Sequence, residues 1–396
     1  MKKRNYIFLS FFMMTFLFLP NICWADELGA MENIPQIVEN QLEVLDVREV
    51  EKLINQIDEE MNQFIPEFSL NKLIQELKNG EINLNPQALL KGSMKYLVKE
   101  VAANLALMGK LVLLAVICAV LTNLQNAFEK GNIAKLAYAI CFLVLITLAI
   151  SSLHMTMEIG REAVTKMVNF MQALMPILLT LLAAIGAFTT TAILHPFILI
   201  TLGLLSTLFT AVVFPLIYLE AVLKIVNNIS DRFKVSRLAG LLKEATMFIL
   251  GLTFTLFIGA LSLQGVGGAV ADGISLRTAK YMTDAFIPIV GGLFADVLEA
   301  VIGGSLLLKN AVGLVGLAAI LFITLFPVIK ILAVVIIYKL AAALIQPIGD
   351  SNLADTIQSM GNSLIMVFAS VATVALMFFL AIIIVVTTAN ITVMLR

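Results

Sequence analysis

From Val101 onward the chain consists of apolar blocks of about 20 residues separated by short polar breaks. A block of that length crosses the roughly 30 Å hydrocarbon core of a bilayer as an α-helix. Hydrophobic residues make up 60% of the sequence and charged residues 13%, which excludes an ordinary soluble domain. The sequence therefore predicts an all-α, polytopic membrane protein with about six to eight transmembrane helices. The blocks lie near 101–122, 134–153, 171–192, 196–219, 246–264, 286–308, 311–337 and 362–388.

The N-terminus has the order of a secretory signal peptide. Three basic residues within the first four positions precede an apolar run over 6–19. Cys23-Trp24-Ala25 then offers a cleavage site after Ala25, so residues 1–25 are predicted to be the signal peptide. An uncleaved anchor is the alternative, and it would export the following segment as well.

Residues 26–98 are predicted to form an exported, acidic, amphipathic helical segment. Between Asp26 and Glu100 the chain carries 15 acidic and seven basic side chains, and positive charge is the kind retained inside the cell. Apolar residues recur there at helical spacing up to a break at Pro66. A second short helix is predicted over Asn71–Lys78, and Pro86 suits the first position of the next helix. The segment is interpreted either as a solvated hairpin or as a docking surface for another exported protein.

The remaining residues, 99–396, form the predicted multispanning domain, which contains a possible internal repeat. The motif at 175–178 resembles that at 287–290, and the motif at 214–217 resembles that at 326–329. Both pairs are 112 residues apart, which suggests repeat units over about 134–245 and 246–361 and a final helix over 362–388. Three crossings per unit would invert the second copy, as in many transporters. Helix kinks are predicted at Pro176, Pro215, Pro288 and Pro327.

The charge pattern conflicts with a crossing at every block. If the N-terminal segment lies outside, four crossings also place the linker 220–245 outside, although positive loops usually stay in the cytoplasm. The basic residues of this linker are Lys224, Arg232, Lys234, Arg237 and Lys243. The conflict disappears if 176–192 and 288–308 do not fully cross but dip into the membrane and return. We expect a full crossing for the first segment and a broken or re-entrant segment for the second.

Three charged residues in the membrane domain are candidates for a polar lining of a pore. Asp296 and Glu299 stand three apart and so share a helix face, and Lys330 follows Pro327 within an apolar block. Ionisable residues at membrane depth usually face a bundle interior or a water-filled path. The alternative is an interfacial helix whose acids simply touch water. The segment Gln264–Gly316 around them is rich in glycine, which lets helices approach closely in lipid.

The sequence carries no motif for an enzyme, cofactor or metal site. Gly265-Val266-Gly267-Gly268 follows an apolar block rather than a strand, so it fails the context of a dinucleotide loop. Neither a Walker lysine, a serine triad, paired metal ligands nor a nucleic-acid patch is present. We therefore predict no catalytic, cofactor-binding or metal-binding residues and no nucleic-acid partner.

Several long strings resemble the stage III sporulation protein AE family of endospore-forming bacteria. They run from Ala269 to Lys280, from Phe286 to Asp296, from Lys309 to Gly313 and from Met175 to Gly186. The order of signal peptide, acidic exported segment and multispanning remainder is similar too. The resemblance implies a membrane component of a channel complex between mother cell and forespore, located in the mother-cell-side (outer forespore) membrane.

The resemblance also implies partners. They are other proteins of the stage III sporulation A operon, among them an ATPase and ring-forming proteins, a forespore-made channel partner, and a membrane insertase of the Oxa1-like class for biogenesis. This chain would be the membrane platform or a permease-like subunit, with energy supplied by the ATPase. Two alternatives remain open, namely a stand-alone secondary transporter that uses the intramembrane acids and a pure assembly scaffold.

Overall fold

The structure is a computed structural model that describes residues 48–62, 69–78, 86–127, 132–229, 234–286, 291–348 and 351–395. Within these residues every element is helical, which confirms the predicted all-α class. The N-terminal helices are α3 (Arg48–Asn62), α4 (Leu70–Lys78) and α5 (Pro86–Ala103). The bundle helices are α6 (Leu105–Ala127), α7 (Asn132–Ala184), α8 (Phe188–Leu208), α9 (Phe214–Ile229), α10 (Ser236–Phe286), α11 (Gly291–Ile345) and α12 (Ser351–Met394). The predicted signal peptide, 1–25, lies outside the described residues.

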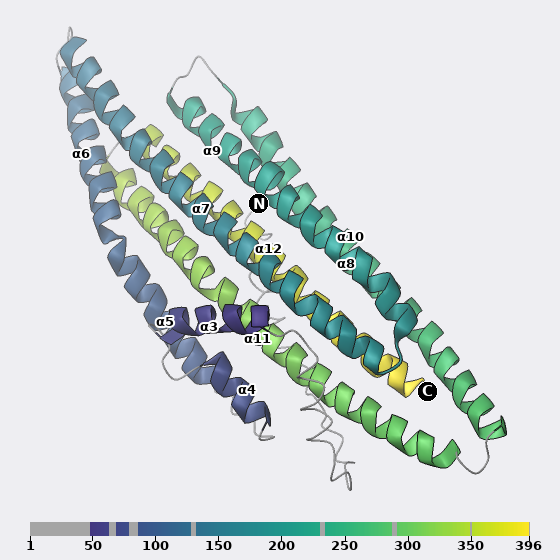
Figure 1. Ribbon diagram of the computed structural model, residues 1–396. Coiled ribbons are helices and arrows are strands. Elements are labelled where there is room, and N and C mark those ends of the chain that lie inside the picture. The colour runs from purple at the N-terminus through teal and green to yellow at the C-terminus, as the bar shows by residue number, and fades with distance from the viewer. Residues whose placement is uncertain are drawn as a thin grey trace.

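Six helices in the described part of the chain are long and apolar enough to cross a membrane. They are α6, α7, the continuous stretch of α8 and α9, α10, α11 and α12. The number falls at the lower end of the predicted range, and the chain is a membrane protein. Figure 1 shows these helices side by side in one elongated bundle. A single π-helical turn, η1 (Phe209–Val213), joins α8 to α9, and a 3-10 turn, η2 (Gln346–Ile348), follows α11.

Helix α12 forms the centre of the bundle. It packs against α7, α9, α10 and α11, and none of its residues between Ser359 and Val386 is exposed. Close approach to its neighbours depends on small residues: a Cβ at Gly313 of α11 would lie 2.5 Å from Val386 Cγ2. The glycine-rich segment predicted to let helices approach closely thus does so against α12.

The structure has fewer and longer helices than the blocks suggested. Helix α7 has 53 residues and α11 has 55, or about 80 Å each at about 1.5 Å per residue. The polar residues around 154–166 and 309–310 do not end a helix, because a helix tolerates polar groups wherever one face meets water or an internal partner. Ion pairs one turn apart, Arg161–Glu158 at 2.7 Å and Lys166–Glu162 at 3.3 Å, also support the helical backbone there.

Two expectations about the apolar blocks were wrong. The block 171–192 is not a single crossing, because α7 ends at Ala184 and the chain turns at Gly186, whose φ is 89°. A residue with a side chain rarely adopts that conformation, so glycine suits this turn. Residues 291–308, expected to be broken or re-entrant, continue unbroken into the rest of α11.

The proposed repeat units therefore contain two long helices each rather than three. The first contains α7 and the α8–α9 stretch, and the second contains most of α10 and all of α11. Two crossings per unit leave the second copy in the same orientation as the first, so the inverted arrangement does not follow from this structure. Pro176 and Pro327 lie inside continuous helices, and Pro215 is the second residue of α9, which follows the π-helical turn. Pro288 lies outside the described residues.

The N-terminal helices pack on one side of the bundle. Helix α4 begins one residue before the predicted start at Asn71, and α5 begins at Pro86 as expected. Asp58 of α3 caps α4, since its carboxylate accepts hydrogen bonds from Ser69 Oγ at 2.6 Å, Leu70 N at 2.6 Å and Asn71 N at 3.0 Å. Helix α3 contacts α7 and α11, and α4 and α5 contact α11. The apolar residues of α3 and α4 that this packing buries are Val50, Ile54, Leu70 and Leu73.

Candidate functional site

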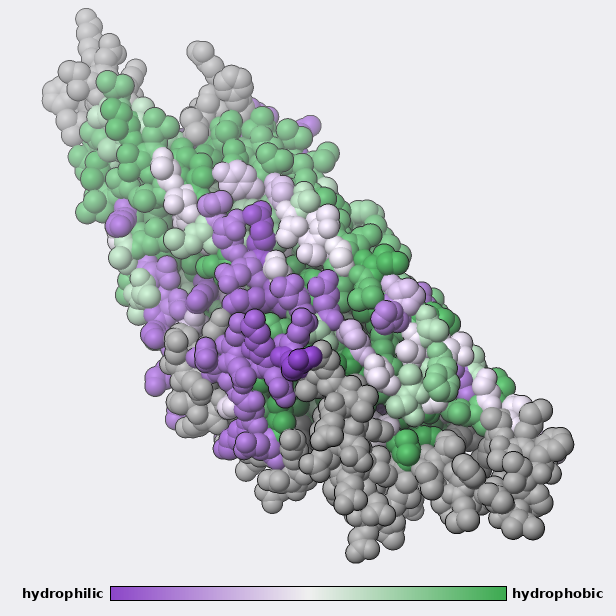
Figure 2. Space-filling view, in the orientation of Figure 1, coloured by the Kyte–Doolittle hydropathy of each residue, from purple (hydrophilic) through white to green (hydrophobic). Residues whose placement is uncertain are grey.

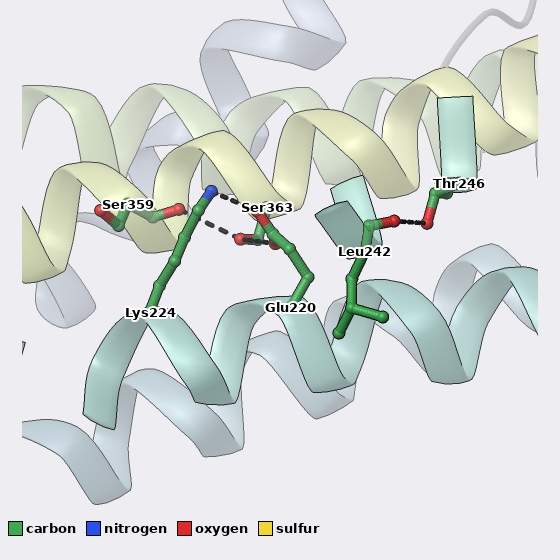
Figure 3. Close-up of polar contacts among 6 residues, drawn as sticks. All are labelled: Glu220, Lys224, Leu242, Thr246, Ser359 and Ser363. Atoms are coloured by element: carbon green, nitrogen blue, oxygen red, sulfur yellow. Dashed lines mark hydrogen bonds and ion pairs between the residues drawn. The ribbon is translucent and has the colours of Figure 1, made fainter. Parts of the chain in front are cut away.

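A buried carboxylate links α9 to the central helix. Glu220 of α9 is 1% exposed, and Ser363 Oγ of α12 donates a hydrogen bond to its Oε2 at 2.6 Å. Lys224, one turn further along α9, forms an ion pair with the other carboxylate oxygen (Figure 3). A buried charge requires such compensation, because leaving water would otherwise cost several kcal/mol. The cluster therefore holds α9 against α12 beside the basic linker.

Hydroxyl groups around this carboxylate are bonded to their own helices. Ser363 Oγ also donates to the Ser359 carbonyl at 3.2 Å, and Thr246 Oγ1 of α10 donates to the Leu242 carbonyl at 2.8 Å (Figure 3). Bonds of this kind satisfy a polar side chain within a helix without a partner from another helix. The Glu220–Lys224 ion pair therefore lies within α9, and the hydrogen bond from Ser363 to Glu220 links α9 to α12.

A second buried carboxylate, Asp272 of α10, caps the start of α8. Its two oxygens accept hydrogen bonds from the backbone N–H groups of Thr189 and Thr190, both at 2.8 Å, and from Thr190 Oγ1 at 2.6 Å. A helix N-terminus presents free N–H groups and a partial positive charge, which suit a carboxylate. Gly268, one turn earlier, leaves room for this contact, because a Cβ there would lie 2.9 Å from Thr190 Cα.

A buried lysine links α11 to α12. Lys309 is fully buried, and its Nζ donates to the Val386 carbonyl at 2.8 Å and to Asn390 Oδ1 at 3.0 Å. Both acceptors are neutral, and within the described residues Lys309 forms no ion pair with a carboxylate. The amine therefore bridges the two helices near the C-terminal end of α12.

The residues predicted to line a pore are not brought together by the described part of the structure. Asp296 and Glu299 lie in the first turns of α11, and their side chains are outside the described residues. Lys330 is exposed and lines a recess of about 450 Å³ between α5, α6, α7 and α11. The other polar residues that line this recess are Glu100, Asn104, Ser151, Ser152 and Thr156.

The three buried charged residues at these helix contacts were not among the sequence candidates. Lys309 was read as part of a break between two apolar blocks, and Glu220 was read as the first residue of a linker. A signal existed for both, because a lone charge that continues an apolar helix pattern is costly in lipid and needs an internal partner. Asp272 follows two glycines in Gly267-Gly268 by one helical turn, but the sequence does not reveal that α8 begins beside it.

The described residues contain no group of three or more His, Cys, Asp or Glu side chains that could hold a metal ion. Each of the two carboxylates described above serves a helix contact. Chemically, these clusters bind helix to helix.

Comparison with known proteins gives a family. The family model described as Stage III sporulation protein AE matches residues 68–389. The chain is 40% identical over 365 residues to Stage III sporulation protein AE of Bacillus subtilis (strain 168), covering 92% of this chain and 91% of that protein. No solved structure matches. The match extends from the N-terminal helices to the end of the central helix, and the chain belongs to the stage III sporulation protein AE family.

Proposed function

We propose that this protein is a membrane subunit of a channel complex between mother cell and forespore, acting as its membrane platform or as a permease-like element. Membership of the sporulation family is the observation that carries the proposal. The six-helix bundle supports it, because a platform needs a rigid membrane-embedded core. The protein would lie in the mother-cell-side (outer forespore) membrane.

The buried carboxylates favour a subunit over a stand-alone transporter. Glu220 is paired with Lys224 and accepts a hydrogen bond from Ser363, and Asp272 is bonded to the start of α8. A carboxylate that binds a transported cation needs oxygens directed into a water-accessible site rather than bonded to helix partners. These two groups instead stabilise contacts between helices.

The proposed partners are those that the family resemblance implies. The acidic N-terminal helices would meet ring-forming proteins on the exported side. The energy would come from a partner ATPase, because the sequence has no nucleotide-binding motif. An Oxa1-like insertase would assist insertion of the bundle. The proposal includes no catalytic step by this chain.

Deletion and rescue test the proposal. The gene is deleted in the host, and forespore size, late forespore-specific transcription and heat-resistant spores are measured. We expect small forespores, reduced late transcription and few spores, all restored by the intact chain. Normal spores after deletion would reject the sporulation role.

A second experiment separates the subunit from the transporter. The chain is purified, reconstituted in liposomes and tested for ion-coupled uptake of candidate solutes, with Glu220→Gln and Asp272→Asn as variants. A subunit without its partners shows no uptake. Solute uptake that these variants abolish would instead identify a secondary transporter.

A further inference from the structure

Between Glu158 and Thr180, helix α7 exposes only polar side chains, although the helix lies between apolar helices. We call these residues the polar stripe: Glu158, Glu162, Thr165, Lys166, Asn169, Gln172 and Thr180. The opposite side of the same helix is buried and apolar, from Ala163 through Leu182. This half of α7 is therefore amphipathic, with one face toward the core and one face that requires water or polar partners.

The polar stripe lies level with an apolar surface on the neighbouring helix. Helices α7 and α8 are antiparallel, and a Cβ at Gly160 would lie 3.2 Å from the ring of Phe214, just after η1. Near the other end, Thr191 Oγ1 lies 3.4 Å from the carbonyl oxygen of Leu179. Residues 158–180 of α7 are thus level with about 191–214. The exposed large hydrophobic residues on that stretch are Ile193, Leu199, Ile200, Leu204 and Val212, which we call the apolar flank. The exposed polar residues there are His195 and Thr207.

Helix α10 continues the apolar flank. A Cβ at Gly268 would lie within 3 Å of Thr190, so this part of α10 is level with the start of α8. Its exposed large residues there are Leu263, Val266, Val270 and Ile274. One side of the bundle therefore suits lipid at the depth where the other side exposes charges.

The polar stripe is as long as a membrane is thick. From Glu158 to Thr180 it extends about 33 Å, and the hydrocarbon core measures about 30 Å. Ion pairs Arg161–Glu158 and Lys166–Glu162 lie at one end, and the amides Asn169 and Gln172 continue along the helix. Lipid contact along that length would leave each of these groups without water, at a cost of several kcal/mol per charge.

The N-terminal helices provide an independent sign of water beside the bundle. Helix α3 contacts α7 and α11, yet its residues Glu49, Glu51, Lys52 and Glu59 are exposed. Figure 2 shows a hydrophilic patch over α3–α5 in the middle of the bundle, between apolar regions toward both ends. Charged helices in that position need water to reach the middle of the bundle's long axis.

We propose that the polar stripe and the α3–α4 hairpin border a water-filled recess at membrane depth, while the apolar flank of α8 and α10 faces lipid. The recess accommodates water and polar solutes. The polar stripe would form part of the wall of the proposed channel. The role of the recess as a passage therefore rests on that proposed function. Its geometry can be tested separately.

Cysteine accessibility on the full-length chain tests the recess. The native Cys23, Cys118 and Cys141 are replaced by serine, and single cysteines are introduced as Gln172→Cys on the stripe and Ile200→Cys level with it on the flank. The protein in native membranes is treated with a membrane-impermeant maleimide, which reacts with thiolate in water. We expect Gln172→Cys to react at least about ten-fold faster than Ile200→Cys, because only the stripe meets water.

Each combination of labelling rates either supports or contradicts the water-filled recess. Equal, rapid labelling at both positions would mean that this half of the bundle lies outside lipid, and it would overturn the recess. Slow labelling at both would mean that the stripe is covered by a dry contact, which also overturns it. Labelling after denaturation confirms that each thiol is present. Asn169→Cys and Leu204→Cys serve as a second pair where a first variant fails to accumulate.

Spore formation separates this result from the proposed function. Variants that restore spores yet label uniformly refute the recess and leave the sporulation role intact.

Discussion

Glu220 is a carboxylate whose two oxygens have different partners, a lysine on its own helix and a serine on the central helix. Replacing Glu220 by alanine leaves the Lys224 ammonium beside a buried hydroxyl with no negative charge. We expect a loss of about 1–3 kcal/mol, below that of a fully buried pair because Lys224 is 22% exposed. The loss would appear as a lower thermal midpoint of the detergent-solubilised protein.

Glu244 of α10 provides the matched control for this prediction. It is exposed, so Glu244→Ala should leave the midpoint within the range of an ordinary surface change. Equal midpoints for the two variants would show that the Glu220 cluster does not stabilise the bundle.

The sequence shows which residues of the membrane domain are charged, but it does not show which of them the structure buries and pairs. A costly charge inside an apolar pattern is visible in the sequence, but its partner is not, since Ser363 lies 143 positions from Glu220. Lys330 was chosen because it follows a proline, and it proves exposed, whereas Lys309 is buried. Long-range pairing thus explains why the candidate site could not be predicted from spacing.

Among the elements, the contact between α8 and α10 depends on one glycine. Gly268→Ala would bring a Cβ to 2.9 Å from Thr190 Cα, next to the helix start that Asp272 caps. We expect a loss of about 1–3 kcal/mol, because backbone atoms cannot yield without shifting α8. Thermal unfolding in detergent measures the effect.

The neighbouring Gly267 serves as the control, because nothing lies within 4 Å of a Cβ built there. Gly267→Ala should be neutral or stabilising by up to about 1 kcal/mol, as expected for alanine in a helix. A destabilisation of both variants by the same amount would argue against the close contact.

The helix count also predicts the sidedness of the basic linker. Three long elements, α6, α7 and α8–α9, precede it, so an exported N-terminus places this linker in the cytoplasm. This removes the conflict with the tendency of positive loops to stay inside. In a chain without native cysteines, Asn228→Cys should react with an impermeant maleimide only when the reagent reaches the cytoplasmic side.

A cysteine at the C-terminal end of the chain is the control for this prediction, because we expect it on the other side of the membrane. After six elements the chain returns to the exported side, so Leu395→Cys should react only from that side. Labelling of both positions from the same side would exclude six crossings.

Helix class and approximate count follow from composition and block length, and both agree with the structure. The positions of the helix ends could not be predicted in this way, because polar residues that resemble breaks between helices can lie on a solvated helix face. Glu158, Glu162 and Lys166 illustrate this, since all three are exposed on one continuous helix. Conversely, the turn at Gly186 falls within an apolar block, where no charged residue marks it.

At the scale of the whole molecule, two long sides of the bundle differ in polarity. The apolar stretch Phe188–Asn228 has 41 residues and extends about 60 Å, longer than the hydrocarbon core. Such a helix tilts or locally thickens the bilayer. The polar stripe of α7 and the exposed charges of α3 instead require water, so we expect the surface to be divided between lipid and water.

This division is the central claim, and spore formation with an altered stripe tests it most directly. The host gene is replaced by a chain carrying Asn169→Leu and Gln172→Leu, with Leu199→Val and Ile200→Val on the flank as the matched control. Heat-resistant spores are counted, and the amount of each protein in the membrane fraction is measured. We predict that the stripe variant accumulates normally but lowers the spore count at least about ten-fold, because an apolar wall expels water, while the flank variant sporulates normally. Full sporulation with the apolar stripe would contradict the account.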